Sequence, residues 1–327
     1  MRGALAILTG TGAAWNAARV LSVAACMLAL PFVFGQGYYL NTLNFVAVFA
    51  LPAIGLSLLS GLCGQLAISH GAFFAIGAYG SAILTLRVGL NPLLATLLTQ
   101  GVVLVVSAAI GSLVLRLRGH YLAIATLSFA IIVEVLIKES PWLTGGQQGM
   151  TGIPPYHLGS LRLDNDNAVY FIYWPLTLLL LWFALNLAQS RYGRMLRAVR
   201  EGEPVVDSLG ISAARHKTLI YIVSSIFAGL GGSMYAHFVA FVTPATGSIM
   251  FAIDIIMVLA LGGFDRLWGA LIGAALITLL NEYALGFADY KRIILGLSLV
   301  GVMLVFPRGL LPGLVDLGLR LMRGRFR

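Results

Sequence analysis

Charged side chains are scarce in this chain: Asp, Glu, Lys and Arg together make up 10% of its 327 residues. Hydrophobic residues make up 59%, and the mean hydropathy is +0.94. A soluble domain that exposed so much apolar surface would aggregate. The composition therefore excludes an ordinary water-soluble protein and indicates an integral membrane protein.

Cysteines and the common catalytic motifs are also lacking. Both cysteines, Cys26 and Cys63, lie in or beside apolar runs, so we interpret them as small buried hydrophobic residues rather than a disulfide. The five histidines are scattered without an HExxH pair, and the chain has no P-loop and no GxSxG. We therefore expect no metal site, no cofactor and no enzymatic activity in this chain.

Positive charge exceeds negative charge, with 21 Lys and Arg against 12 Asp and Glu and a net charge of +9. The basic residues do not gather into one aromatic-rich patch, so nucleic acid is not an expected partner. They lie beside the ends of apolar segments, where such residues set membrane topology and contact anionic lipids. Membrane lipids are therefore expected partners.

The apolar segments predict about ten membrane-spanning helices, each near the length that crosses about 30 Å of hydrocarbon. The expected fold is an all-α polytopic bundle in which residues 1–327 form one transmembrane domain. No small-x-small cleavage site follows the first segment, so it is predicted to remain as a span. The expected spans are 20–34, 42–59, 66–86, 92–115, 121–137, 170–188, 218–241, 250–263, 268–284 and 293–306.

An even number of spans puts both termini on the same side of the membrane. Arg2 and Arg19 near the start, and the arginines of residues 308–327, assign that side to the cytoplasm. The loop 190–217 then lies inside and the loop 138–169 outside. Lys291 and Arg292 fall on the outer side, against the usual charge rule.

The longest charged run, residues 190–217, lies between two apolar segments and must project into water. Residues 191–201 favour a helix with its arginines near one face, and Gly202 can end that helix in a left-handed conformation. Pro204 suits the first turn of a second, short helix, which Gly210 would stop, and Ser212 can cap the helix that re-enters the membrane. We predict one apolar edge made by Val205, Val206 and Leu209 and a polar edge made by Asp207 and Ser208.

A short amphipathic helix at the tip of a cytoplasmic loop has a suitable shape for a groove on a soluble partner. The alternative is a solvated loop with some lipid-headgroup contact, which basic residues beside a membrane make by default. The candidate docking residues are Arg194, Arg197, Arg200, Glu201, Glu203, Val205, Val206, Asp207, Leu209 and Gly210.

Glycines and polar groups interrupt the start of the span 66–86. Gly61 and Gly64, followed by Gln65, Ser69 and His70, suggest a broken or late-starting helix that lines a cavity, because unpaired backbone is too costly in lipid. The candidate pathway residues in this stretch are Gln65, Ser69, His70, Phe73 and Phe74.

Two carboxylates fall within spans, and such groups usually face the interior of a bundle. Glu134 has Lys138 one turn away, so a simple pair at the membrane interface is a good alternative to a pathway role. Asp254 has no partner nearby in the sequence. It is a pathway candidate, and a structural hydrogen bond to a neighbouring helix is an equal alternative.

Small residues recur at helical spacing in two spans, at Ser225, Gly229 and Ser233 and at Gly269 and Gly273. Such spacing favours close contact between helix backbones. In the outer loop, a flexible, polar and uncharged stretch is a candidate gate or docking surface, or a simple turn. Its residues are Gly145, Gly146, Gln147, Gln148 and Gly149.

Four stretches, in this order, resemble one known family. They are GLCGQLAISHGAFFAIGAYGSAIL from residue 61, TGGQQGMTGIP from residue 144, RYGRMLRAVREGEPVVDSLGIS from residue 191, and LALGGFDRLWGALIGAALI from residue 259, with FPRGLL following from residue 306. Together they are similar to the M-type permease subunit of branched-chain amino-acid ABC importers. The resemblance extends from about residue 41 to residue 311.

The resemblance implies a type II importer-like fold in the bacterial inner membrane. It implies a paired H-type permease, two cytoplasmic ATPase subunits that bind ATP and Mg, and a periplasmic or extracellular substrate-binding protein. Substrates of the family are branched-chain or other hydrophobic amino acids, and close relatives carry amides, urea or aromatic acids. An ion-gradient-driven secondary transporter is the alternative, and it would need midplane carboxylates, for which Asp254 alone is plausible.

The same resemblance implies that residues 201–211 are the segment that couples the permease to its ATPases. The family's acidic, small and glycine positions fall on Glu203, Asp207 and Gly210. The sequence departs from the family pattern at residues 204–206, which are Pro-Val-Val, and at Asp207 and Asp254, where Glu is more usual.

Overall fold

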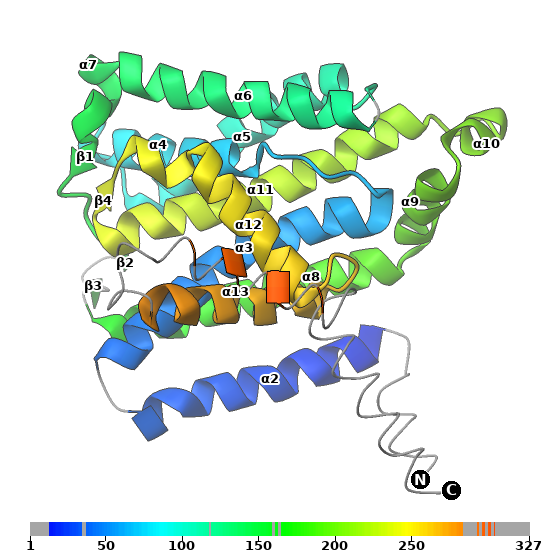
Figure 1. The fold of residues 1–327 in the computed structure, drawn as a ribbon. Helices are drawn as coiled ribbons and strands as arrows, with labels where there is room; N and C mark the ends of the chain where they lie inside the picture. Colours follow the sequence, from blue (N-terminus) through cyan, green and yellow to red (C-terminus); the bar gives the residue numbers. More distant parts are fainter. Residues whose placement is uncertain are drawn as a thin grey trace, which may run out of the picture.

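We describe a computed structural model of the chain, shown in Figure 1. It describes residues 13–34, 37–117, 119–158, 161–162 and 165–283, together with isolated helical positions between 293 and 304. The structure describes only isolated positions of the predicted span 293–306. Outside the described residues lie Arg2, Lys291, Arg292 and the C-terminal arginines. Their predicted topology stays a prediction.

The described chain is almost entirely helical, which confirms the predicted all-α class. Its α-helices are α2 (Ala13–Phe34), α3 (Tyr38–Cys63), α4 (His70–Leu86), α5 (Pro92–Val114), α6 (His120–Glu139), α7 (Pro141–Thr144), α8 (Asp166–Gln189), α9 (Arg191–Glu201), α10 (Glu203–Ser208), α11 (Ala213–Val239), α12 (Ile249–Gly262) and α13 (Leu267–Tyr283). Two 3-10 turns, η1 (Gly146–Gln148) and η2 (Pro244–Gly247), lie near one end of the bundle.

Four very short strands pair at that same end. β1 (Met150–Thr151) runs antiparallel to β4 (Phe241–Val242), with Met150 opposite Val242. β2 (His157–Leu158) runs antiparallel to β3 (Leu161–Arg162), with His157 opposite Arg162. The β1–β4 pair connects the loop after α7 to the end of α11, and the β2–β3 pair is a local hairpin.

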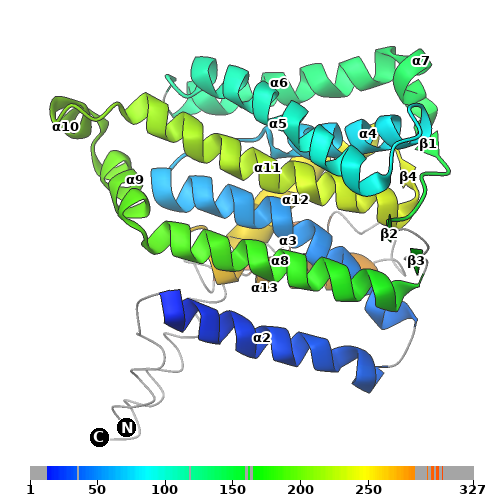
Figure 2. The same ribbon diagram turned by 180° about the vertical axis from the view of Figure 1, so that it is seen from behind.

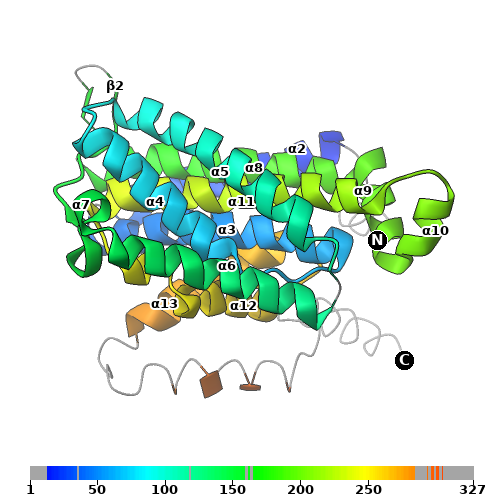
Figure 3. The same ribbon diagram turned by 90° about the horizontal axis from the view of Figure 1, so that it is seen from above.

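The long helices run along one common direction, so the molecule has two distinct ends. The helices α9 and α10 project at one end, and α7 with the strands lies at the other (Figures 1 and 2). The perpendicular view in Figure 3 separates the same two ends. The long helix α11 lies at the centre and packs most extensively against α4, α3 and α5.

Small residues allow these central helices to approach closely. A side chain at Gly77 in α4 would meet the backbone carbonyl of Gly229 in α11, and one at Gly232 would meet the carbonyl of Phe74. The Ser233 hydroxyl also donates to the carbonyl of Gly77, at 3.0 Å. The predicted role of the small-residue faces in helix packing is therefore confirmed for α11, and Gly273 packs in the same way against the carbonyl of Val258.

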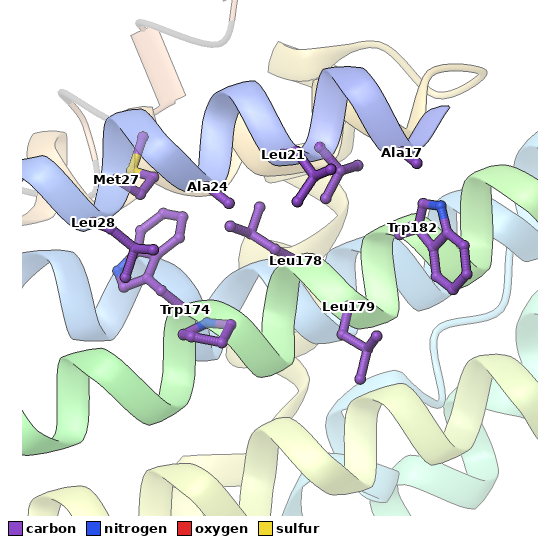
Figure 4. Close-up of a pocket in the computed structure, with 11 residues that line it drawn as sticks. Ala17, Leu21, Ala24, Met27, Leu28, Trp174, Leu178, Leu179 and Trp182 are labelled. Atoms are coloured by element: carbon purple, nitrogen blue, oxygen red, sulfur yellow. The ribbon is translucent and has the colours of Figure 1, made fainter. Parts of the chain in front are cut away.

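The helix α2 lies along α8 at one side of the bundle (Figures 1 and 4). The side-chain amide of Asn16 donates to Asn186 at 3.1 Å and to Gln189 at 3.0 Å, and the Tyr170 hydroxyl donates to the carbonyl of Met27 at 2.7 Å. Between these contacts an apolar cavity of about 320 Å³ separates the two helices.

A helix matches every predicted span up to residue 284, but the helices differ from ten simple crossings. Five are long and apolar enough to cross a membrane unaided, or six if the bent pair α12 and α13 is one span, among the described residues. The axes of α12 and α13 differ by 117° at a break of a few residues. Gly263 in that break has φ of +104°, a conformation that L side chains rarely adopt, so the chain reverses there.

Candidate functional site

The helix α9 begins where α8 ends, and the sequence sets this corner. The Ser190 hydroxyl accepts a hydrogen bond from the amide of Gly193 at 3.1 Å, which caps α9. A side chain at Gly193 would meet the carbonyls of Leu187 and Ala188. Leu196 and Val199 are buried, so one face of α9 packs on the bundle and the other faces outward.

Three of the four arginines of α9, which the sequence placed near one face, have different surroundings. The Arg200 guanidinium donates to Asp265 at 2.7 Å and to the carbonyl of Gly61 at 2.8 Å. Arg194 donates to the carbonyl of Gln189 at 3.0 Å, and Arg197 is exposed. Arg200 thus joins α9 to the end of α3 and to the turn between α12 and α13.

The link from α9 to α10 differs from the prediction. Gly202 has φ of −172° and is extended rather than left-handed, because α10 begins at the next residue. The carbonyl of Gly202 accepts a hydrogen bond from the amide of Val206 at 3.3 Å, in the first turn of α10. Pro204 does lie in the first turn of α10, and Gly210 has φ of +80°, as expected for the stop. Glu201 is exposed at the last position of α9.

The predicted single apolar edge of α10 is divided between two faces, so that prediction is wrong. Val206 is 5% exposed and packs with Val199 and Ala213, whereas Val205 and Leu209 are 66% and 74% exposed. Adjacent positions on a helix point about 100° apart, but positions four apart share a face. Val205 and Leu209 therefore form an outward apolar pair, and Val206 attaches α10 to its neighbours.

Asp207 and Ser208 are both exposed, as predicted for the polar edge, and Asp207 also contributes to the attachment. Its carboxylate accepts a hydrogen bond from the amide of Ala213 at 2.9 Å, and the Ser212 hydroxyl accepts from the amide of Arg215 at 3.5 Å. Together they satisfy backbone donors at the start of α11, where negative charge is favourable. The predicted cap at Ser212 is confirmed, and Asp207 is a second one.

Lys217 is a residue of this site that the sequence reading missed. Its side chain is 2% exposed, and its ammonium lies 2.5 Å from the carboxylate of Glu203 and donates to the carbonyl of Leu115 at 3.4 Å. The pair joins α10 to the first turns of α11 and to the end of α5. A lysine one turn inside an apolar helix, with an acid on the preceding loop, is the signal that could have identified it.

Tyr192 adds a further contact between α9 and α11. Its hydroxyl donates to the carbonyl of His216 at 3.2 Å, and the two rings lie edge to face. Burial raises the pKa of the Tyr192 hydroxyl to about 12, so the group stays a neutral donor at any physiological pH.

The interrupted start of α4 matches its prediction. Gly64, with φ of +67°, ends α3, and the chain runs without helix through residues 65–67 before α4 begins at His70. The amide of Ile68 donates to the hydroxyl of Thr126 at 3.2 Å, which satisfies one backbone group of this stretch from α6. A late-starting helix is therefore confirmed.

Ser69 and His70 are buried in packed protein. The hydroxyls of Ser69 and Tyr221 lie 2.7 Å apart, and Nε2 of His70 lies 2.6 Å from the hydroxyl of Ser224. Ser224 in turn donates to the carbonyl of Gly55 at 2.5 Å. This hydrogen-bonded cluster holds α3, α4 and α11 together, which is a structural use of residues predicted to line a pathway.

The two phenylalanines predicted for the pathway are in different surroundings. Phe73 packs between Phe129 and Tyr221, with ring centres 5.4 and 5.7 Å away. The ring of Phe74 lies 4.4 Å from that of Phe251, beside half-buried rings of α3 and α11. Gln65 is buried, and its side-chain oxygen has no hydrogen-bond partner among the described residues.

The two carboxylates within spans lie on different helices and in different surroundings. Glu134 pairs with Lys138 at 2.6 Å, as the simple alternative supposed. Asp254 lies half-buried on α12, one turn after Phe251. The pathway candidates thus do not form one cluster, and their role in transport stays a prediction.

The outer stretch of residues 145–149 is a turn built on glycine. Gly145, Gly146 and Gly149 have φ of +77°, +59° and +75°, and a side chain at Gly149 would meet the carbonyl of Val242. Gln147 and Gln148 are exposed on η1. The turn is confirmed, and a gate or docking role stays a prediction.

Comparison with known proteins gives a consistent result. The family model described as "Branched-chain amino acid transport system / permease component" matches residues 38–303. The chain is 31% identical over 320 residues to the high-affinity branched-chain amino acid transport system permease protein LivM of Salmonella typhimurium, which covers 90% of this chain and 74% of that protein. Its identity to the LivM protein of Escherichia coli is 30%, over 90% of this chain and 75% of that one.

A second group of relatives is more distant. The chain is 24% identical over 290 residues to the permease protein LivH of Salmonella typhimurium, covering 83% of this chain and 93% of that protein. No solved structure matches the chain.

Proposed function

This chain belongs to the permease-component family of branched-chain amino acid transport systems, and we propose that it transmits work from ATPase subunits to a transport pathway through α10. It is a multi-pass helical membrane protein and a permease subunit of an ABC importer. The sequence identity to LivM, 31%, is higher than the identity to LivH, 24%, which supports the M-type role. The proposed partner is an H-type permease. Two ATPase subunits and an external binding protein complete the proposed assembly.

The proposed substrates are branched-chain or other hydrophobic amino acids, or related small amides, urea or aromatic acids. The names of the relatives support the first class. We propose the bacterial inner membrane as the location, with the α9 and α10 end in the cytoplasm. The arginines of α9 support that orientation, because basic loops are retained on the cytoplasmic side.

The observation that carries the proposal is the division of α10 into an outer and an inner face. Val205 and Leu209 are exposed and apolar, which suits a groove on a soluble subunit. On the inner side Glu203, Val206 and Asp207 contact α11 or its first turn. A push on the outer face therefore reaches α11 directly, and α11 packs on α3, α4 and α5.

The inner contacts are strong enough for α10 and α11 to move together. Separating Glu203 from Lys217 would leave a charged ammonium buried, which costs about 3–5 kcal/mol. Thermal motion rarely supplies that energy, so a displacement of α10 carries the start of α11 with it. Rigid-body movement of such packed elements is a usual form of conformational switching.

The test is the substitution Leu209→Asp, which places a charge in the proposed contact with the ATPase. We expect loss of ATPase co-purification and at least about tenfold slower substrate uptake in proteoliposomes that contain all subunits, because a buried unpaired charge costs several kcal/mol. The matched control is Val88→Asp, since Val88 is 61% exposed in the loop before α5, whose Asn91 contacts His157 of β2 at the opposite end of the bundle from α10 (Figure 1). The control should assemble normally.

Full uptake by Leu209→Asp would contradict the proposal. Uptake by this chain without an ATPase, driven by an ion gradient, would favour the secondary-transporter alternative.

A further inference from the structure

A second cavity, of about 370 Å³, opens at the end of the bundle that carries α9. It lies between the last turns of α3 and α8, the helix α9, and the turn that joins α12 to α13. The exposed apolar pair Val205 and Leu209 on α10 does not line it. The cavity is thus separate from the proposed ATPase contact, although it adjoins the base of the same loop.

Positive charge predominates around this cavity. Arg197, Arg200 and Arg266 line it, and Asp265 is the one carboxylate in the lining. Arg200 is engaged by Asp265 at 2.7 Å and by the carbonyl of Gly61 at 2.8 Å. The guanidinium groups of Arg197 and Arg266 have no hydrogen-bond or ion-pair partner among the described residues, so both remain for an anion.

The rest of the lining is largely apolar. Leu58 and Leu62 come from α3, Leu185 from α8, and Leu267 and Trp268 from the start of α13. The leucines are buried and Trp268 is half-buried, so a free inorganic anion would pair with the arginines and leave the exposed part of the Trp268 ring uncovered. A ligand that carries both a phosphate and hydrocarbon would use both parts of the cavity. Arginine suits the phosphate, and tryptophan is enriched at the level of lipid headgroups.

We infer that this cavity binds the headgroup of an anionic phospholipid. Arg197 and Arg266 hold the phosphate, and the first carbons of the acyl chains lie against Leu62 and Trp268. The bound lipid connects α9 with the turn between α12 and α13, next to the Arg200–Asp265 contact. It therefore stabilises the base of the loop that carries α10. The inference does not depend on the proposed function.

Native mass spectrometry tests the site on the full-length chain, purified in mild detergent with the subunits that co-purify. The protein is offered phosphatidylglycerol or phosphatidylcholine with identical acyl chains. We expect retention of phosphatidylglycerol about tenfold above phosphatidylcholine, and loss of that preference in Arg197→Gln/Arg266→Gln, because each basic residue near an anionic headgroup adds appreciably to affinity.

The matched control is Arg191→Gln/Arg215→Gln, which removes two exposed arginines that do not line the cavity. It should keep the preference of the unmodified chain. Equal loss in both variants would overturn the inference, since it would indicate diffuse attraction to a basic surface. Equal retention of both lipids by the unmodified chain would overturn it without any variant.

A final arm separates the lipid from a free anion. Inorganic phosphate at millimolar concentration should leave phosphatidylglycerol bound, because it cannot occupy the apolar wall. Displacement of the lipid by phosphate would assign the arginines to a soluble anion and overturn the inference.

Discussion

The ammonium group of Lys217 is the most costly charge to leave unpaired in the described part of the molecule. A buried ion pair contributes little net stability when intact, because desolvation offsets the attraction. Removal of one partner is different, since the other charge then stays buried alone. Glu203 and Lys217 should therefore behave as a unit rather than as two independent residues.

We predict that Glu203→Gln lowers the free energy of unfolding by about 3–5 kcal/mol and impairs uptake, because it leaves the buried Lys217 ammonium unpaired. Lys217→Met should cost less, because the Glu203 carboxylate that it leaves is partly exposed. The double variant should lose clearly less than the sum of the two, because it leaves no buried charge. Thermal unfolding in detergent, combined into a double-mutant cycle, measures the difference.

The pair Glu134 and Lys138 is the natural control, because it is also an ion pair but its lysine is much more exposed than Lys217. Glu134→Gln should change the unfolding free energy by less than about 1 kcal/mol. Additive losses in the Glu203 and Lys217 cycle would show that the two groups do not act as a pair.

At the scale of elements, α4 and α11 meet backbone to backbone. Their contact relies on the absence of a side chain at Gly77, opposite the carbonyl of Gly229. A larger residue must push the helices apart, and Ser233 would then lose its bond to the Gly77 carbonyl. Packed helices tolerate such displacement poorly.

We predict that Gly77→Val destabilises the protein by about 2 kcal/mol or more, through overpacking and the lost hydrogen bond. Gly101→Ala in α5 is the matched control, because nothing lies within 4 Å of the added methyl group. That control should be neutral or slightly stabilising, as alanine favours helix over glycine. Unchanged thermal stability in Gly77→Val would mean that the helices do not approach as closely as described.

The sequence predicted those elements whose causes are local. The glycines and polar residues from Gly61 to His70 indicated the late start of α4, and Gly210 indicated the end of α10. The extended conformation of Gly202 was not predictable in the same way. It depends on Gly202 being the single residue between the end of α9 and the start of α10, which fixes the direction of the chain there.

The contacts of α9 and α10 could not be predicted, because their partners are distant in sequence. Arg200 meets Asp265, which lies 65 residues later. The inward turn of Val206 depends on Val199 and Ala213 being placed beside it. Periodicity gives an apolar side of a helix, but it cannot choose between neighbouring valines when both faces of a six-residue helix can be occupied.

At the scale of the whole molecule, the two ends differ in chemistry and should face different compartments. The end with α9 and α10 carries arginines. The end with β1 and β4 carries the glycine-rich turn of residues 145–149, which precedes β1. Because basic loops are retained on the cytoplasmic side of a membrane, we assign the arginine-rich end to the cytoplasm.

Single cysteines introduced after removal of Cys26 and Cys63 test this orientation. Leu209→Cys should react with a membrane-impermeant thiol reagent only in inside-out vesicles, and Gln147→Cys only in right-side-out cells. Both positions are exposed, so failure of access is not expected. Labelling of residue 209 from the outer side would reverse the topology and remove the basis for ATPase contact.

The start of α4 also has a consequence for biosynthesis. Ile68, Ser69 and His70 obtain their hydrogen bonds from residues 58, 152 and 154 positions later in the chain. The ribosome therefore delivers this stretch to the membrane well before its partners exist. Until Tyr221 and Ser224 arrive, its polar groups must wait in the water-filled insertion machinery or in the headgroup layer. Nascent chains truncated before α11 should accordingly leave residues 64–70 open to digestion by added protease, and only the completed polypeptide should protect them.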